Sequence, residues 1–119
     1  MNKEQDENIK IFRLHSGEDV ITFYEEFEQG VVIINPMVII ESNHKNKFLI
    51  KPLLPFRILE NNVTLLYSND IQFIMVPTQT IIDYYLSAVE QVEIEMFESY
   101  VNEQTSLVEN KSNNSITVH

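Results

Sequence analysis

The order of hydrophobic and polar positions predicts a series of short strands followed by one long helix. In the first part of the chain, β-branched and aromatic residues recur in short segments without a helical period, and Gly17 and Gly30 lie in turns between them. Proline cannot donate a ladder hydrogen bond, so Pro36 predicts a bend or a sheet edge, and Pro52 and Pro55 predict an irregular or edge segment. The predicted strands and extended segments are residues 9–14, 20–27, 31–34, 37–40, 48–58, 63–67 and 71–76.

Beyond the last of these strands the hydrophobic period becomes that of a helix. Apolar residues from Ile81 to Tyr100 follow one another at steps of four, four, three, four and four, which places them on one face. We expect an amphipathic helix over about residues 78–101, with Thr78 or Thr80 as its N-cap. Its roughly six turns span about 36 Å, more than a small barrel covers, so part of the apolar stripe is expected to contact another chain.

These elements predict an all-β fold, a small, strongly bent antiparallel barrel of about five to six strands with one long C-terminal α-helix. The barrel and helix occupy residues 9–102. Residues 1–8 form a polar extension, and residues 103–119 are too polar to fold alone and are interpreted as a tail. A barrel of so few strands leaves open edges, and pairing with a second copy of the chain is one way to cover them.

Composition narrows the class of protein. A chain of 119 residues with 44% hydrophobic residues fits one globular domain. The absence of cysteine excludes disulfides, thiol catalysis and zinc sites built on cysteine. No apolar run approaches the roughly 20 residues that cross a bilayer, and the N-terminus does not resemble a signal peptide. We therefore expect a soluble cytoplasmic protein with no membrane association.

Charge is unevenly distributed along the chain. The formal net charge of -10 repels nucleic acid and anionic membranes when the chain is taken as a whole. However, the stretch from Ser42 to Leu59 contains no acidic residue, whereas that from Ile58 to Asn110 contains many and neither lysine nor arginine. The basic stretch is a candidate nucleic-acid contact, and solvated strand and helix faces are the simpler interpretation. Its basic residues are Lys45, Lys47, Lys51 and Arg57.

No constellation of residues predicts catalysis. The three histidines, His15, His44 and His119, are far apart and have no partner at the spacing of metal ligands. His15, Ser16 and Asp19 are the residue types of a catalytic triad, but their adjacency within one turn does not give triad geometry. The glutamates of the helix lack the spacing of a calcium loop. We expect a protein that is not an enzyme and that binds no metal or cofactor.

Three segments resemble the Sm-like proteins. The first Sm strand and its glycine turn are similar to Ile9-Lys-Ile-Phe-Arg-Leu-His-Ser-Gly-Glu-Asp-Val20, and the end of the first Sm motif is similar to Phe27-Glu-Gln-Gly-Val-Val-Ile-Ile-Asn-Pro36. The second Sm motif resembles Val63-Thr-Leu-Leu-Tyr-Ser-Asn-Asp-Ile-Gln-Phe-Ile-Met-Val-Pro77. Within the family, the Asn-Pro pair, the Pro-x-x-Pro-Phe segment and Tyr84-Tyr85 look like the Sm-like proteins of cyanophages and T4-like phages. A phage-encoded protein would act in the cytoplasm of the host cell.

The resemblance implies a homo-oligomeric ring, a pentamer or hexamer, in which the last strand of one subunit pairs with the preceding strand of the next. The strand and helix patterns support an interface between copies because the last strand is apolar on both faces. The residues expected at the interface are Val63, Leu65, Phe73, Ile74, Met75 and Tyr85.

The resemblance also implies that the ring binds single-stranded RNA, at positions matching Gln29, Tyr67, Ser68 and Asn69. Two positions depart from the family pattern. Gly30 stands where relatives stack a bulky side chain on a base, and Ser68-Asn69 stands where relatives place a basic residue. The alternative is a non-catalytic phage scaffold that binds no nucleic acid and contacts a protein partner through the acidic helix or the tail.

Overall fold

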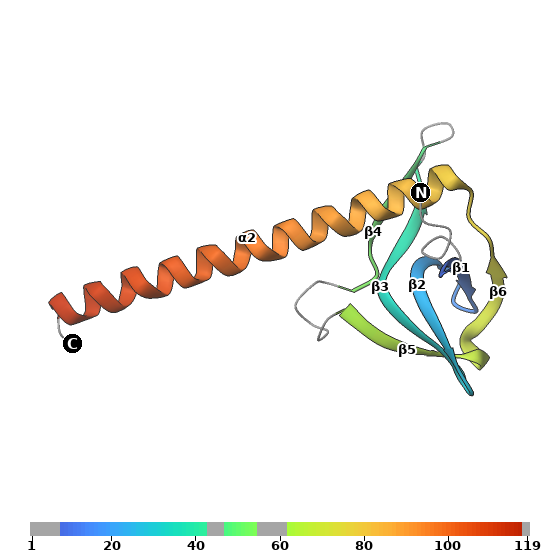
Figure 1. Ribbon diagram of the computed structural model, residues 1–119, viewed down its shortest axis with the longest axis horizontal. Helices are drawn as coiled ribbons and strands as arrows, with labels where there is room; N and C mark the ends of the chain where they lie inside the picture. The colour runs from blue at the N-terminus through green and yellow to red at the C-terminus, as the bar shows by residue number, and fades with distance from the viewer. Residues whose placement is uncertain (1–7, 43–46, 55–61, 118–119) are drawn as a thin grey trace. The chain divides into compact units, whose positions relative to one another are not determined.

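Six antiparallel strands form a single sheet in the computed structural model, and one long helix follows them (Figure 1). The structure describes residues 8–42, 47–54 and 62–117, with side chains as far as residue 102. The sheet order is β4-β3-β2-β1-β6, and β5 pairs with β3 outside this path. The elements are β1 (Ile9–Leu14), β2 (Asp19–Phe27), β3 (Gly30–Glu41), β4 (Phe48–Pro52), β5 (Val63–Tyr67), the 3-10 turn η2 (Ser68–Asp70), β6 (Ile71–Met75) and α2 (Gln79–Thr117).

Strand β3 joins two segments that the sequence predicts as separate strands. Its first half, Gly30–Ile34, pairs with β5, and its second half, Met37–Glu41, pairs with β4. Pro36 lies between these two halves, so a proline fits inside the strand, and the carbonyl of Pro36 accepts the N–H of Leu53. Asn35 has a positive φ of 54°, which marks the irregularity at this point.

The sheet is open. Among the described residues, the outer edges of β4, β5 and β6 pair with no other strand. The six strands and the C-terminal helix confirm a small antiparallel β fold with one helix, but closure into an Sm-like barrel remains a prediction. The open edges determine which parts of the molecule are available to other chains.

The core lies on both faces of the sheet. On β2 the consecutive residues Val20, Ile21 and Thr22 are all buried, and consecutive strand residues point to opposite faces. One face covers a cluster of four buried residues, Phe12, Val31, Ile33 and Leu66. The partly buried side chains of Leu14, Tyr24 and Ile71 pack against this cluster. Such two-sided burial explains why the strands are apolar with little alternation.

Tyr85 anchors helix α2 to the sheet. Its side chain is fully buried, its ring lies 5.4 Å from that of Phe23, and its hydroxyl accepts the N–H of Phe23 at 3.1 Å. The hydroxyl donates to the carbonyl of Asn35 at 2.9 Å, with the carbonyl of Ile34 at 3.2 Å. Burial raises the pKa of Tyr85 far above its ordinary value. Tyr85 is predicted to lie at an oligomer interface, whereas the structure buries its side chain inside the subunit.

Replacing Tyr85 by phenylalanine should lower the free energy of unfolding by about 1–3 kcal/mol, because the buried N–H of Phe23 loses its acceptor. Tyr84→Phe is the matched control, since the side chain of Tyr84 is exposed on the same helix. Urea unfolding followed by circular dichroism measures both variants. Equal stability of the two variants would contradict a role for the Tyr85 hydroxyl.

Arg13 and Asp19 join β1 to β2 at the end near the first turn. Two hydrogen bonds of 2.7 and 2.8 Å connect the guanidinium to the two carboxylate oxygens. The Arg13 hydrogen bond holds the pKa of Asp19 below its ordinary value. Because both side chains are partly exposed, the pair fixes local geometry more than it stabilises the fold.

Helix α2 begins as the sequence predicts and ends later. The N–H of Ile81 donates to the hydroxyl of Thr78 at 3.3 Å, which identifies Thr78 as the N-cap. The helix runs to Thr117 rather than ending near residue 101, and this segment contains neither glycine nor proline to stop it.

The chain divides into two units within this helix. Met1–Val89 contains the sheet and the first turns of α2, and Glu90–His119 forms the second unit. In the first unit Ile82, Tyr85 and Val89 are buried, whereas in the second Ile94, Phe97 and Tyr100 are exposed. Within the described residues, no helix has the length and apolar character needed to span a membrane.

Candidate functional site

Two turns that are distant in the sequence lie side by side. The β2–β3 turn meets the junction of β5 and η2, because Gly30 pairs with Tyr67 and the N–H of Ser68 donates to the carbonyl of Gln29 at 2.9 Å. Between them is an open cavity of about 440 Å³, here called the polar hollow. Its lining residues are Glu28, Gln29, Tyr67, Ser68 and Asn69.

Gly30 permits the close approach of the two turns. A Cβ atom at this position would lie 2.1 Å from the carbonyl oxygen of Leu66 and 2.8 Å from the Cα of Tyr67. Both distances are too short for real contacts, and both atoms belong to the backbone, which cannot rotate away. No side chain fits at residue 30 without displacing β5, so glycine at this position has a steric cause in this chain.

The side chains of the polar hollow suit a neutral planar group. The Tyr67 ring packs edge-on against Phe27, with 6.0 Å between ring centroids, and is 46% exposed, so a face remains accessible to a ligand. Gln29, Ser68 and Asn69 supply both donors and acceptors of hydrogen bonds. Of the described residues that line the hollow, only Glu28 is charged, and its charge disfavours phosphate there.

The structure brings together four of the eight predicted RNA-contact residues. Gln29, Tyr67, Ser68 and Asn69 all line the polar hollow. The exposed Lys47 and Lys51 lie on the β4 side, where Lys51 pairs with Val38, eight residues along β3 from Gly30. Neither lysine is among the residues that line the hollow. Lys45 and Arg57 lie outside the described residues.

Five of the six predicted interface residues lie on the two edge strands next to η2. On β5, Val63 and Leu65 are 38% and 50% exposed, and on β6 Phe73 and Ile74 are 54% and 60% exposed. Met75 is half-buried, and Tyr85 is the one that lies in the core. Val76, the most exposed large apolar side chain described, directly follows β6 and is not among the predicted interface residues.

Neither a metal cluster nor a triad of His15, Ser16 and Asp19 forms in the described part of the chain. No three His, Cys, Asp or Glu side chains there gather as metal ligands. The hydroxyl of Ser16 donates to Glu18 at 2.5 Å rather than to His15, so the triad residue types do not form a triad. The polar hollow therefore offers binding groups, with an aromatic face and hydrogen-bonding side chains.

Comparison with known proteins adds no family to this picture. No protein-family model matches the chain, and no curated protein is significantly similar to it. The function proposed below therefore depends on the resemblance of three segments and on the geometry of the edges and the polar hollow.

Proposed function

We propose that this chain is an Sm-like subunit that assembles into a homo-oligomeric ring, a pentamer or hexamer, and that the polar hollow binds single-stranded RNA. The observation that carries the assembly is that β5 and β6, joined by η2, each have an outer edge without a strand partner in the described part of the chain. Pairing β6 of one copy with β5 of the next is a heterologous contact, which closes a ring when the rotation between copies allows it.

The composition of the two edges supports pairing. The β5 sequence VTLLY and the β6 sequence IQFIM contain no lysine, no proline and no acidic residue. Proteins usually protect free edges with charges, proline or bulges, and these two strands expose large apolar side chains instead. Pairing between copies would satisfy the backbone and bury those side chains together.

The polar hollow supports RNA binding through its chemistry. Each copy would place one hollow next to its paired edges, because Tyr67 ends β5 and Ser68-Asn69 begins η2. A base stacks on an aromatic face, and its edge bonds to amide and hydroxyl groups. Glu28 and the net charge make the electrostatic contribution unfavourable, so binding is expected to be weak and to require low ionic strength.

Tyr67→Ala should weaken the binding of U-rich or A-rich oligonucleotides by roughly 5- to 100-fold, since loss of one stacked base costs about 1–3 kcal/mol. Fluorescence anisotropy at low salt measures the affinity, and light scattering on the same samples reports assembly separately. Tyr84→Ala is the control, because Tyr84 is exposed but lies outside the polar hollow. Equal affinities of the two variants would remove the polar hollow as the RNA site.

A second function is an interaction scaffold without nucleic-acid binding. The observation that favours it is that, among the described residues, Glu28 lines the polar hollow and no lysine or arginine does. The second unit carries exposed Ile94, Phe97 and Tyr100 on a helix rich in glutamate, a surface suited to a protein partner. Intact assemblies that bind no oligonucleotide at low salt would support the scaffold over the RNA-binding ring.

A further inference from the structure

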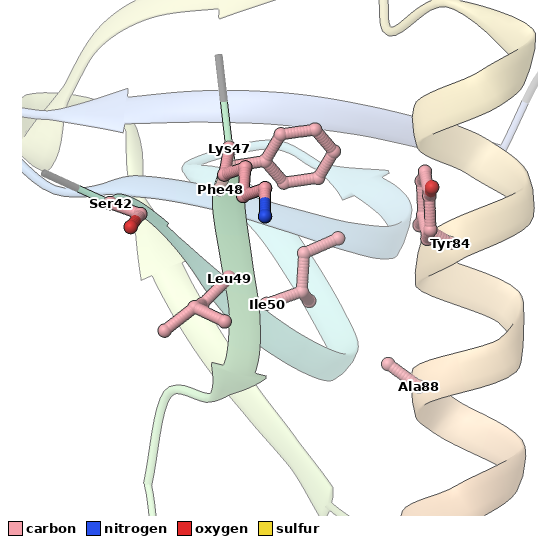
Figure 2. A pocket seen from close by; sticks show the side chains of 7 residues that line it. All are labelled: Ser42, Lys47, Phe48, Leu49, Ile50, Tyr84 and Ala88. Carbon is pink, nitrogen blue, oxygen red and sulfur yellow. The ribbon is translucent and has the colours of Figure 1, made fainter. Parts of the chain in front are cut away.

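A groove runs between β4 and the first turns of α2, and it shares no lining residue with the polar hollow. Its volume is about 620 Å³, and its walls are Phe48, Leu49 and Ile50 on the strand and Tyr84 and Ala88 on the helix, with Ser42 and Lys47 completing it. Figure 2 shows Phe48 and Ile50 directed toward the helix and Leu49 directed the other way. Consecutive residues of a strand point their side chains to opposite faces of the sheet. Because Phe48, Leu49 and Ile50 all line the groove, the groove follows the backbone of β4.

The hydrogen-bond register shows which backbone groups of β4 point to the outer edge of the sheet. The N–H of Ser42 donates to the carbonyl of Lys47, and the N–H of Leu53 donates to that of Pro36. Backbone groups in an antiparallel ladder alternate between one neighbour and the other, so odd-numbered residues here point toward β3. Phe48 and Ile50 therefore direct their N–H and C=O groups to the outer edge, where the described residues provide no partner strand.

Pro52 limits the length of this free edge. It occupies the next outward-facing position after Ile50 and has no N–H to donate. The edge thus offers two complete pairs of backbone groups, one at Phe48 and one at Ile50, enough for a short strand. A segment added there would place its inward side chains against Tyr84 and Ala88, which form the helix wall of the groove.

The charges along β4 indicate which kind of segment can pair with its outer edge. Lys47 and Lys51 are exposed, and Leu49 between them is 63% exposed. Two copies of β4 paired antiparallel about Leu49 would bring Lys47 of one opposite Lys51 of the other, and opposed like charges are unfavourable. An acidic strand at the same edge would place opposite charges there instead. The lysines therefore disfavour self-pairing and favour an acidic partner.

We propose that the β4 edge binds an extended acidic segment of another protein by strand addition. The segment carries acidic side chains opposite Lys47 and Lys51 and apolar side chains toward Tyr84 and Ala88. This edge is separate from β5 and β6, so peptide binding leaves assembly unchanged and is independent of the proposed ring and RNA functions.

The test uses a short fluorescein-labelled peptide of alternating glutamate and valine, titrated into the full chain at low salt. Saturable binding is expected, with valines toward the helix and their N–H groups toward β4. N-methylation of the valines should abolish binding because it removes those donors. N-methylation of the glutamates, whose N–H groups point away, should leave binding intact. Backbone amide shifts at Phe48 and Ile50 in NMR spectra should accompany the titration.

Charge reversal supplies the matching test on the protein. The double variant Lys47→Glu with Lys51→Glu should bind the peptide about tenfold more weakly, because two favourable cross-strand pairs become like-charged. Both side chains are exposed, so the fold should be retained. Absence of saturable binding, equal binding of the two methylated peptides, or displacement of the peptide by oligouridylate would each overturn the proposal, and the last would assign the lysines to nucleic acid.

Discussion

Ile74→Glu should convert the assembled protein into folded monomers of 14.0 kDa. Ile74 is 60% exposed within the subunit, so a carboxylate there meets water in the monomer and does not disturb the core. In the proposed ring the same side chain lies at the β6 edge that pairs with the next copy, where an unpaired charge would lose its hydration. Multi-angle light scattering should show a five- or sixfold drop in mass, with unchanged circular dichroism.

The control for this variant is Ile94→Glu, the same chemical change at an exposed position of α2 that belongs to the second unit. It should remain assembled. A monomeric wild-type chain at micromolar concentration, or an Ile74→Glu variant with the wild-type mass, would contradict the ring.

A mixture of two variants tests which strand edges pair between copies. Leu65→Glu damages the β5 edge and leaves β6 intact, whereas Ile74→Glu does the reverse. If β6 of one copy pairs with β5 of the next, mixing the two monomeric variants should give a dimer that grows no further. A self-complementary contact between two β6 edges would instead leave Leu65→Glu fully assembled.

The strands were predictable because their signals are local. Short β-branched segments between turn residues identified β1, β2, β5 and β6 almost to the residue, and Thr78, one of the two predicted N-caps, precedes the helix. The continuity of β3 was not predictable from local signals. Pro36 normally interrupts a strand, and it is tolerated here because the partner of β3 changes from β5 to β4 at that point. Such an exchange of partners depends on pairing between distant segments.

The buried face of the helix illustrates a second limit on what the sequence can predict. The apolar stripe placed Tyr85 correctly on one face of α2, but the stripe alone does not distinguish a side chain bound by the sheet from one that meets another chain. The hydroxyl of Tyr85 is held by Phe23 and Asn35, which lie 62 and 50 residues earlier in the chain. Only the tertiary structure shows that this residue completes the subunit.

The candidate site was partly predictable for a different reason. Matching motif positions brought Gln29 together with Tyr67, Ser68 and Asn69, and the structure places these four around one cavity. From the motif positions alone, we interpreted Gly30 only as the loss of a side chain that stacks on a base. The steric requirement at Gly30 arises from the Leu66 carbonyl, which the sequence does not locate beside it.

Gly30→Ala should therefore be among the most damaging single-methyl additions to this chain. The new Cβ would lie 2.1 Å from the carbonyl oxygen of Leu66, so β5 must move away from β3. Overpacking of this kind costs about 1–3 kcal/mol, and displacement of β5 adds the loss of ladder hydrogen bonds. Thermal unfolding should show a lowered midpoint, and amide hydrogen exchange should show lost protection concentrated in β5.

Oligonucleotide binding distinguishes damage to the polar hollow from a general loss of stability. Moving β5 shifts Tyr67, Ser68 and Asn69 away from Gln29, so Gly30→Ala should lose oligonucleotide binding even at temperatures where it remains folded. Gln29→Ala is the comparison within the same turn, because its exposed side chain can be truncated without a clash. That variant should keep wild-type stability and lose only part of the affinity. If Gly30→Ala is as stable as Gln29→Ala, the contact between the two turns does not hold β5 in place, and the polar hollow is not a fixed site.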